Sequence, residues 1–200
     1  MGIIGVVAAL TLPNLNSSTA NKEKVVKLQK IYSNLQDAFG RATAVYGPTD
    51  EWCTGLTNDA CNKRYFERVT EFMKFSKQCT VSDNCSLKFD TGLSAGQSMK
   101  YGVILADGAT IDIFGALSGW ATIMIDLDGF NKGANKHCYD YFKLFYAPSS
   151  GLIPKCSYDS GTSISSVSHS DRCTAWILEN GNMDDLKCSG LKFGTNTTCK

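Results

Sequence analysis

The chain opens with the apolar stretch GIIGVVAALTLPNL (Gly2–Leu15), which runs on into NKEKVVKLQKIYSNLQDAFGRATAVYG (Asn21–Gly47). Apolar residues in the second stretch recur every three or four positions, which is typical of a helix with one buried face. These residues are Leu28, Ile31, Leu35, Ala38, Ala42 and Val45. The lysines Lys22, Lys24, Lys27 and Lys30 fall outside this stripe, so we expect a solvated face there. Gly47 and Pro48 end the predicted helix.

The segment Gly2–Leu12 is uncharged and spans about 16 Å as a helix, less than the roughly 20 residues needed to cross a bilayer. Pro13 predicts a local break in the helix. One alternative is the apolar region of a secretory signal peptide cleaved after Ala20, but the positively charged leading region is missing. Another alternative, a buried core helix, is disfavoured by the glycines and by Pro13.

The rest of the chain predicts a sheet that follows a second helix. The helical pattern covers Ala60–Lys77, and two β-rich runs around an Asp-Gly turn predict a hairpin over Tyr101–Leu105 and Ala109–Phe114. Further strands are expected at Ala121–Leu127 and Tyr139–Tyr146, and a short helix at Cys173–Glu179. We therefore predict an α+β fold, in which a long N-terminal helix packs on an antiparallel sheet of three or four strands. A loop region stapled by disulfides follows.

The chain has 200 residues and a formal net charge of +1, which indicates one domain and no general nucleic-acid binding. Nine cysteines stand out, and none forms the C-x-x-C pattern of a structural zinc site. Eight of them form sequence-local couples, which suit disulfides in an oxidising compartment. The couples are Cys53 with Cys61, Cys79 with Cys85, Cys156 with Cys173, and Cys188 with Cys199. Cys138 is left over, and reduced cysteines in a cytosolic protein are the alternative.

An acidic run that begins at the end of the third predicted strand is the best candidate for a ligand site. Asp126, Asp128, Asn135 and Asp140 offer the oxygen ligands that Ca²⁺ requires, although the spacing is not that of an EF-hand, and no other cofactor is predicted. The alternative is a turn in which Asp and Asn side chains bond their own backbone. Gly92–Gly96 fits the G-x-S-x-G pattern, which makes Ser94 a remote candidate for a hydrolase nucleophile, with His137 or His169 as the base.

GIIGVVAALTLPNL resembles the second half of the N-terminal segment of the type IV pilin-like (prepilin) family. LADGATIDI, DLDGFNKGANKHCYDYF and CTAWILENGNMDDLKC are also similar to minor-pilin-like members of that family. The basic leader, the cleavage glycine and the early glutamate of the family are absent before Gly2, so we expect a truncated N-terminus. The resemblance implies that residues 1–20 are the remnant of an apolar helix and that residues 21–200 form one periplasmic or extracellular domain. It also raises the calcium hypothesis, because some members of the family bind calcium in a comparable loop.

The resemblance implies a structural subunit, not an enzyme: a minor pilin or pseudopilin of a type IV pilus or a type II secretion filament. It would lie in the bacterial cell envelope, in the inner membrane before assembly, and would then contact other pilin subunits through its N-terminal helix. The residues expected to pack in the membrane and the filament are Ile3, Ile4, Val6, Val7, Ala8, Ala9, Leu10, Leu12 and Pro13. A secreted disulfide-rich binding or adhesin module is the alternative, and a secreted serine hydrolase using Ser94 is a remote one.

Overall fold

The computed structural model describes residues 3–80, 101–129, 132, 138–154, 163–166 and 169–199, with the side chains of the first helix from Thr19 onward and of the last helix from Arg172 onward. The helices are α1 (Ile3–Tyr46), α2 (Asn58–Thr70) and α3 (His169–Asn180). The strands are β1 (Lys77–Thr80), β2 (Tyr101–Ile104), β3 (Thr110–Gly115), β4 (Ala121–Asp126), β5 (Tyr141–Ala147) and β6 (Gly151–Pro154). Short 3-10 helices lie at η1 (Thr49–Glu51), η3 (Ile164–Ser166) and η4 (Asp184–Leu186).

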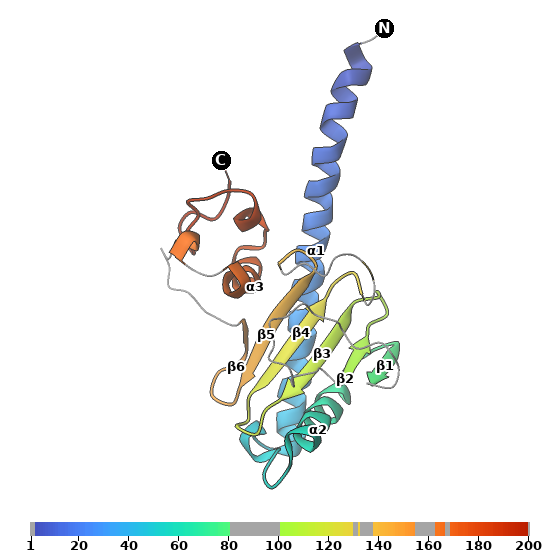
Figure 1. The fold of residues 1–200 in the computed structure, drawn as a ribbon, viewed down its shortest axis with the longest axis vertical. Coiled ribbons are helices and arrows are strands. Elements are labelled where there is room, and N and C mark those ends of the chain that lie inside the picture. The colour runs from blue at the N-terminus through green and yellow to red at the C-terminus, as the bar shows by residue number, and fades with distance from the viewer. Residues whose placement is uncertain are drawn as a thin grey trace.

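The strands form one antiparallel sheet of six, in the order β1-β2-β3-β4-β5-β6 (Figure 1). The α+β class is therefore confirmed, but the expected number of three or four strands is wrong. The two missed strands, β1 and β6, are the edges of the sheet and have four residues each. Strands this short carry too few residues to show an alternating pattern, and pairing with β2 and β5 supplies their backbone hydrogen bonds.

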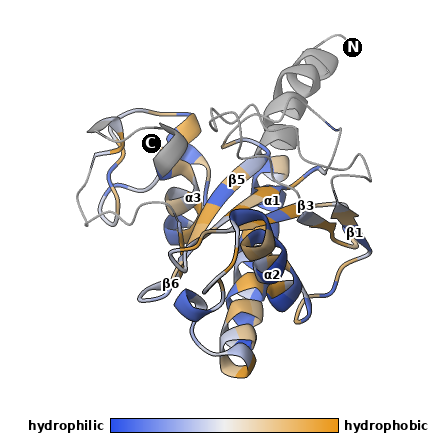
Figure 2. Ribbon diagram, turned by 60° about the horizontal axis from the view of Figure 1, so that its bottom comes forward, coloured by the Kyte–Doolittle hydropathy of each residue, from blue (hydrophilic) through white to orange (hydrophobic). Residues whose placement is uncertain are grey.

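Helix α1 lies across one face of the sheet and buries a continuous apolar stripe against it (Figure 1). The buried positions are Val25, Leu28, Ile31, Leu35, Ala38, Phe39 and Ala42. The ring of Phe39 stacks on that of Tyr146 in β5, with 4.3 Å between centroids. Figure 2 shows hydrophobic residues along α1, β3 and β5. Of the predicted apolar positions, only Val45 lies outside the core, at 61% exposure.

The helices differ from the prediction at Pro13 in α1 and at both ends of α2. Helix α1 continues through Pro13, so the expected break there is wrong, and it ends at Tyr46 before Gly47, which has φ +77°. Helix α2 begins at Asn58 and ends at Thr70, seven residues before the predicted end. Its first turn is capped by Thr57, and its last turn gives way to tighter turns that lead into β1.

Helix α2 packs on β3 at a point where only glycine fits. A Cβ atom on Gly115 would lie 2.1 Å from the ring of Tyr65, so the strand and the helix could not approach as closely with any other residue. Tyr65 in turn donates a hydrogen bond to the carbonyl of Gly119 at 2.6 Å. The helix thereby fixes the turn between β3 and β4.

The C-terminal region has a small apolar core of its own, formed by Ile164, Ala175, Trp176, Leu191 and Phe193. Three disulfides are described: Cys53–Cys61, Cys138–Cys173 and Cys188–Cys199. The first and the third confirm predicted couples. The second shows that the couple of Cys156 with Cys173 and the unpaired state of Cys138 are wrong predictions. Cys79 is also disulfide-bonded, while Cys85 and Cys156 lie outside the described residues.

The disulfides indicate that the protein folds in an oxidising compartment outside the cytoplasm. Within the described part of the chain, no helix holds an apolar stretch long enough to span a membrane.

Candidate functional site

The acidic run begins with Asp126, whose side chain lies fully buried at the end of β4. Its Oδ1 atom accepts hydrogen bonds from the backbone N–H of Asp128 at 3.2 Å and of Gly129 at 3.1 Å. Gly129 has φ +91°, and a Cβ atom there would lie 2.1 Å from the carbonyl oxygen of Gly108. The end of β4 is therefore a side-chain-capped turn packed against the turn between β2 and β3.

The carboxyl groups of Asp126 and Asp128 contact each other. Burial, and then a hydrogen bond between the two side chains, raise the pKa of Asp126 from 3.8 to about 7. The Oδ2 atom of Asp126 and the Oδ1 atom of Asp128 are buried acceptors that receive no hydrogen bond from an N–H or hydroxyl group of the described residues. Two carboxylates in contact repel each other unless a proton or a cation neutralises one of them.

The predicted calcium ligands are brought together only in part. Asp140 is joined to the turn through its backbone, because its carbonyl accepts the N–H of Leu127 at 2.7 Å. Asn135 lies outside the described residues. The described part of the chain holds no group of three acidic, histidine or cysteine side chains that could bind a metal ion. Calcium therefore stays a prediction, and a proton shared by the carboxyl groups of Asp126 and Asp128 is the alternative.

Two lysines of α1 hold this end of the sheet, which corrects the expectation of a solvated face for them. The ammonium group of Lys24 donates to the carbonyl of Tyr139 at 2.7 Å. That of Lys27 donates to the carbonyl of Leu127 at 2.6 Å, and lies 3.5 Å from the carboxylate of Asp107. Lys24 and Lys27 immediately precede buried Val25 and Leu28, so their place at the border of the apolar stripe was the signal in the sequence.

The N-terminal part of α1 projects away from the sheet (Figure 1). This part contains the backbone of all the residues predicted to pack in a filament or membrane, from Ile3 to Pro13, while their side chains lie outside the described set. The structure thus places the predicted packing residues on one continuous helix with the part that is buried against the sheet.

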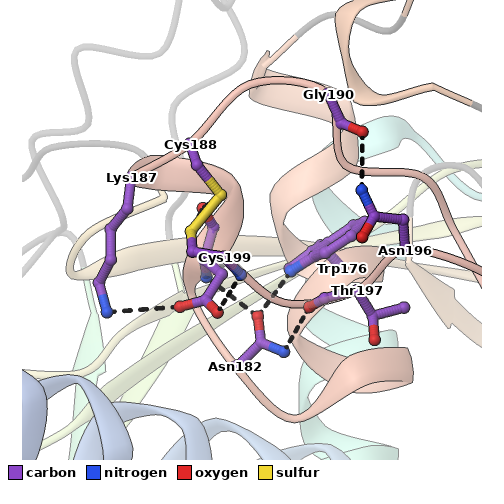
Figure 3. The surroundings of a disulfide bond; sticks show 9 residues. Trp176, Asn182, Lys187, Cys188, Gly190, Asn196, Thr197 and Cys199 are labelled. Atoms are coloured by element: carbon purple, nitrogen blue, oxygen red, sulfur yellow. Dashed lines mark hydrogen bonds and ion pairs between the residues drawn. A yellow bond between two sulfur atoms is a disulfide. The ribbon is translucent and has the colours of Figure 1, made fainter.

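The C-terminal region is tied by Asn182, which uses both ends of its amide (Figure 3). Its Oδ1 atom accepts from Trp176 Nε1 at 2.9 Å and from the N–H of Asp184 at 3.0 Å. Its Nδ2 atom donates to the carbonyl of Thr197 at 3.0 Å. The Cys188–Cys199 disulfide closes the same loop, where Asp184 accepts the N–H of Cys199 at 3.1 Å. With a further hydrogen bond from Nδ2 to the carbonyl of Asn180 at 3.2 Å, these contacts hold the loop region together and use the whole side-chain amide of Asn182.

The described residues do not test the hydrolase hypothesis. Ser94 and His137 lie outside them, and His169 begins α3. The sequence therefore remains the only support for that hypothesis.

No family model, no curated protein and no solved structure matches this chain.

Proposed function

We propose that this protein is a structural subunit of a bacterial filament, a minor pilin or pseudopilin that assembles through its N-terminal helix. The observation that carries the proposal is the single 44-residue helix α1, which is buried in the core over its second half and leaves the sheet over its first.

The projecting part of α1 is uncharged and largely apolar, so it is expected to bind a partner. From Ile3 to Ser18 it extends about 24 Å and carries no charged residue. An uncharged, largely apolar helix gains free energy when its surface leaves water, through contact with lipid or with the same helix of neighbouring subunits. The buried half of α1 packs on the sheet, and the projecting half continues the same helix. A pull on the projecting half is therefore transmitted to the head.

The proposed location is the bacterial cell envelope, with the head outside the cytoplasm, where the disulfides are stable. The inner membrane before assembly and other pilin subunits afterwards are the proposed partners of α1. A secreted binding module would need the same head but would have no use for the projecting helix.

The test is to express the gene with its natural upstream sequence in a host that has a prepilin peptidase and a pilus or secretion machinery. We expect the mature protein to keep the helix Ile3–Ser18 and to form cross-links between chains through a cysteine introduced at Leu10. A matched cysteine at exposed Lys192 should give no such cross-link. Cleavage after Ala20, with release of the head, would overturn the proposal and favour the secreted binding module.

A further inference from the structure

One exposed face of α1 carries an apolar residue between two lysines. Lys22, Val26 and Lys30 are spaced by four residues and therefore lie along one face of the helix. Val26 is 64% exposed, although its neighbour Val25 is buried. The face borders a shallow groove of about 460 Å³, which Lys27 and Asp107 also line.

The groove has a net charge of +1, because Lys22, Lys27 and Lys30 outnumber the two acidic residues of its lining. Lys27 and Asp107 are 3.5 Å apart and neutralise each other, and Glu23 is the other acidic residue in the lining. Neither Lys22 nor Lys30 forms an ion pair within the described residues, and both are exposed. The groove thus offers an apolar centre with an ammonium group one helical turn to each side.

The opposite end of the head offers the complementary pattern. In the turn between β3 and β4, Leu117 and Trp120 are each 47% exposed. Beside this turn lie Asp50 and Glu51 of η1, both exposed and neither ion-paired within the described part of the chain. Arg64 of α2 places one positive charge near η1, where its Nη1 atom donates a hydrogen bond to the carbonyl of Trp52 at 3.1 Å, and the two carboxylates outnumber it.

The turn and η1 are fixed to each other, so this acidic patch (Asp50, Glu51, Leu117 and Trp120) has a defined shape. The carbonyl of Gly119 accepts hydrogen bonds from the hydroxyl groups of Thr49 at 3.1 Å and Tyr65 at 2.6 Å. A Cβ atom on Gly119 would lie 2.7 Å from Cα of Asp50, which shows how closely the two segments approach. A patch that is already ordered loses little conformational entropy when it binds.

We propose that the groove of one copy of this chain binds the acidic patch of a second copy. The two surfaces lie at opposite ends of the head along α1, with about 30 Å of helix between Val26 and Tyr46 (Figure 1). Because the two surfaces differ, each contact leaves one of each kind open, and repeated contacts build an open chain of heads. The occupant is a second copy because the same molecule carries both complementary patterns. This contact would add an interaction between heads to the proposed filament, and its role in the cell rests on that proposed function.

The test uses charge reversal in the full chain, with self-association measured by sedimentation velocity in one nonionic detergent. Variant one is Lys22→Glu with Lys30→Glu, and variant two is Asp50→Lys with Glu51→Lys. Each variant alone places like charges at the contact, so we expect association weakened by at least about tenfold. An equimolar mixture should regain association, because the two reversed surfaces then face each other at one junction and the two unchanged surfaces at the next, with opposite charges at both. Lys74→Glu with Lys192→Glu makes the same charge change on exposed residues elsewhere and should behave like the parent protein.

Three results would overturn the contact: no association of the parent protein, association unchanged in both variants, or weakened association that the mixture does not regain. The last result would mean that the two surfaces do not face each other. A Lys74→Glu, Lys192→Glu control weakened as much as variant one would instead mean that net charge, not this pairing, controls association. The Leu10 cross-link described above reports on the helix alone. If that cross-link forms while charge reversal has no effect, only the head contact is wrong. If charge reversal and rescue succeed while the helix is cleaved off, the filament proposal is wrong and the head contact stands.

Discussion

Cys138 and Cys173 form a disulfide that joins the segment just before β5 to helix α3 across 35 residues of sequence. It is the longest-range of the three described disulfides, because the other two close 8 and 11 residues. Both cysteines are fully buried in the main core. The bond therefore attaches the C-terminal region to the sheet, while Cys53–Cys61 and Cys188–Cys199 each close a local loop.

Replacing Cys138 and Cys173 together by serine should lower the free energy of unfolding by about 4 kcal/mol, from the loop-closure entropy of 35 residues. Replacing Cys53 and Cys61 should cost less, about 2 to 3 kcal/mol, because that loop has 8 residues. Urea denaturation of both double variants measures the difference. Equal losses would show that the Cys138–Cys173 bond does not restrict the unfolded chain as its span predicts.

Lys27→Met should destabilise the protein by about 1 to 2 kcal/mol, because it removes a charged donor from the carbonyl of Leu127 while keeping the aliphatic stem. Lys30→Met is the matched control on the same helix, since Lys30 is exposed and should change stability little. Thermal unfolding at protein concentrations too low for self-association compares the two. A control as destabilised as Lys27→Met would mean that the bond to Leu127 contributes nothing.

The pKa of Asp126 predicts how stability depends on pH. Burial and the Asp128 contact raise this pKa to about 7 in the folded protein, against 3.8 as its usual value. The folded state therefore binds the proton more tightly, and stability should fall as pH rises from about 4 to about 7. Burial also raises the pKa of Asp185 to about 6, which adds a decline in the same direction.

Asp126→Asn should reduce the loss of stability between pH 4 and pH 7 and leave the part due to Asp185. The amide keeps the Oδ1 acceptor and does not titrate. Asp37→Asn is the matched control, as it removes an exposed carboxylate from α1. Urea midpoints between pH 4 and pH 8 measure the slope. An identical slope in the parent protein and in Asp126→Asn would show that Asp126 is not protonated in this range.

Calcium and a shared proton at Asp126 and Asp128 make opposite predictions. If calcium binds, excess calcium should raise the melting temperature above that in EDTA, more at pH 7.5 than at pH 5, because protons compete for the same oxygens. Asp126→Asn should then lose the effect. A melting temperature that neither EDTA nor calcium changes would end the calcium prediction and leave the shared proton.

Local patterns in the sequence determined much of the fold. The apolar repeat from Leu28 to Ala42 predicted the buried face of α1, and the Asp107-Gly108 turn predicted the hairpin of β2 and β3. Helices and hairpins are set by residues a few positions apart, so their signals lie within short windows. The couples Cys53–Cys61 and Cys188–Cys199 were predictable for the same reason.

Only the tertiary structure decided which distant groups meet. The edge strands β1 and β6 exist through pairing with their neighbours, and Cys138 meets Cys173 because β5 and α3 lie side by side. Likewise Lys27 reaches Leu127, 100 residues away, and the surface around Trp120 lies beside Asp50, because the folded sheet brings them together. Such contacts depend on the packing of the whole core, and no periodicity in the sequence encodes them.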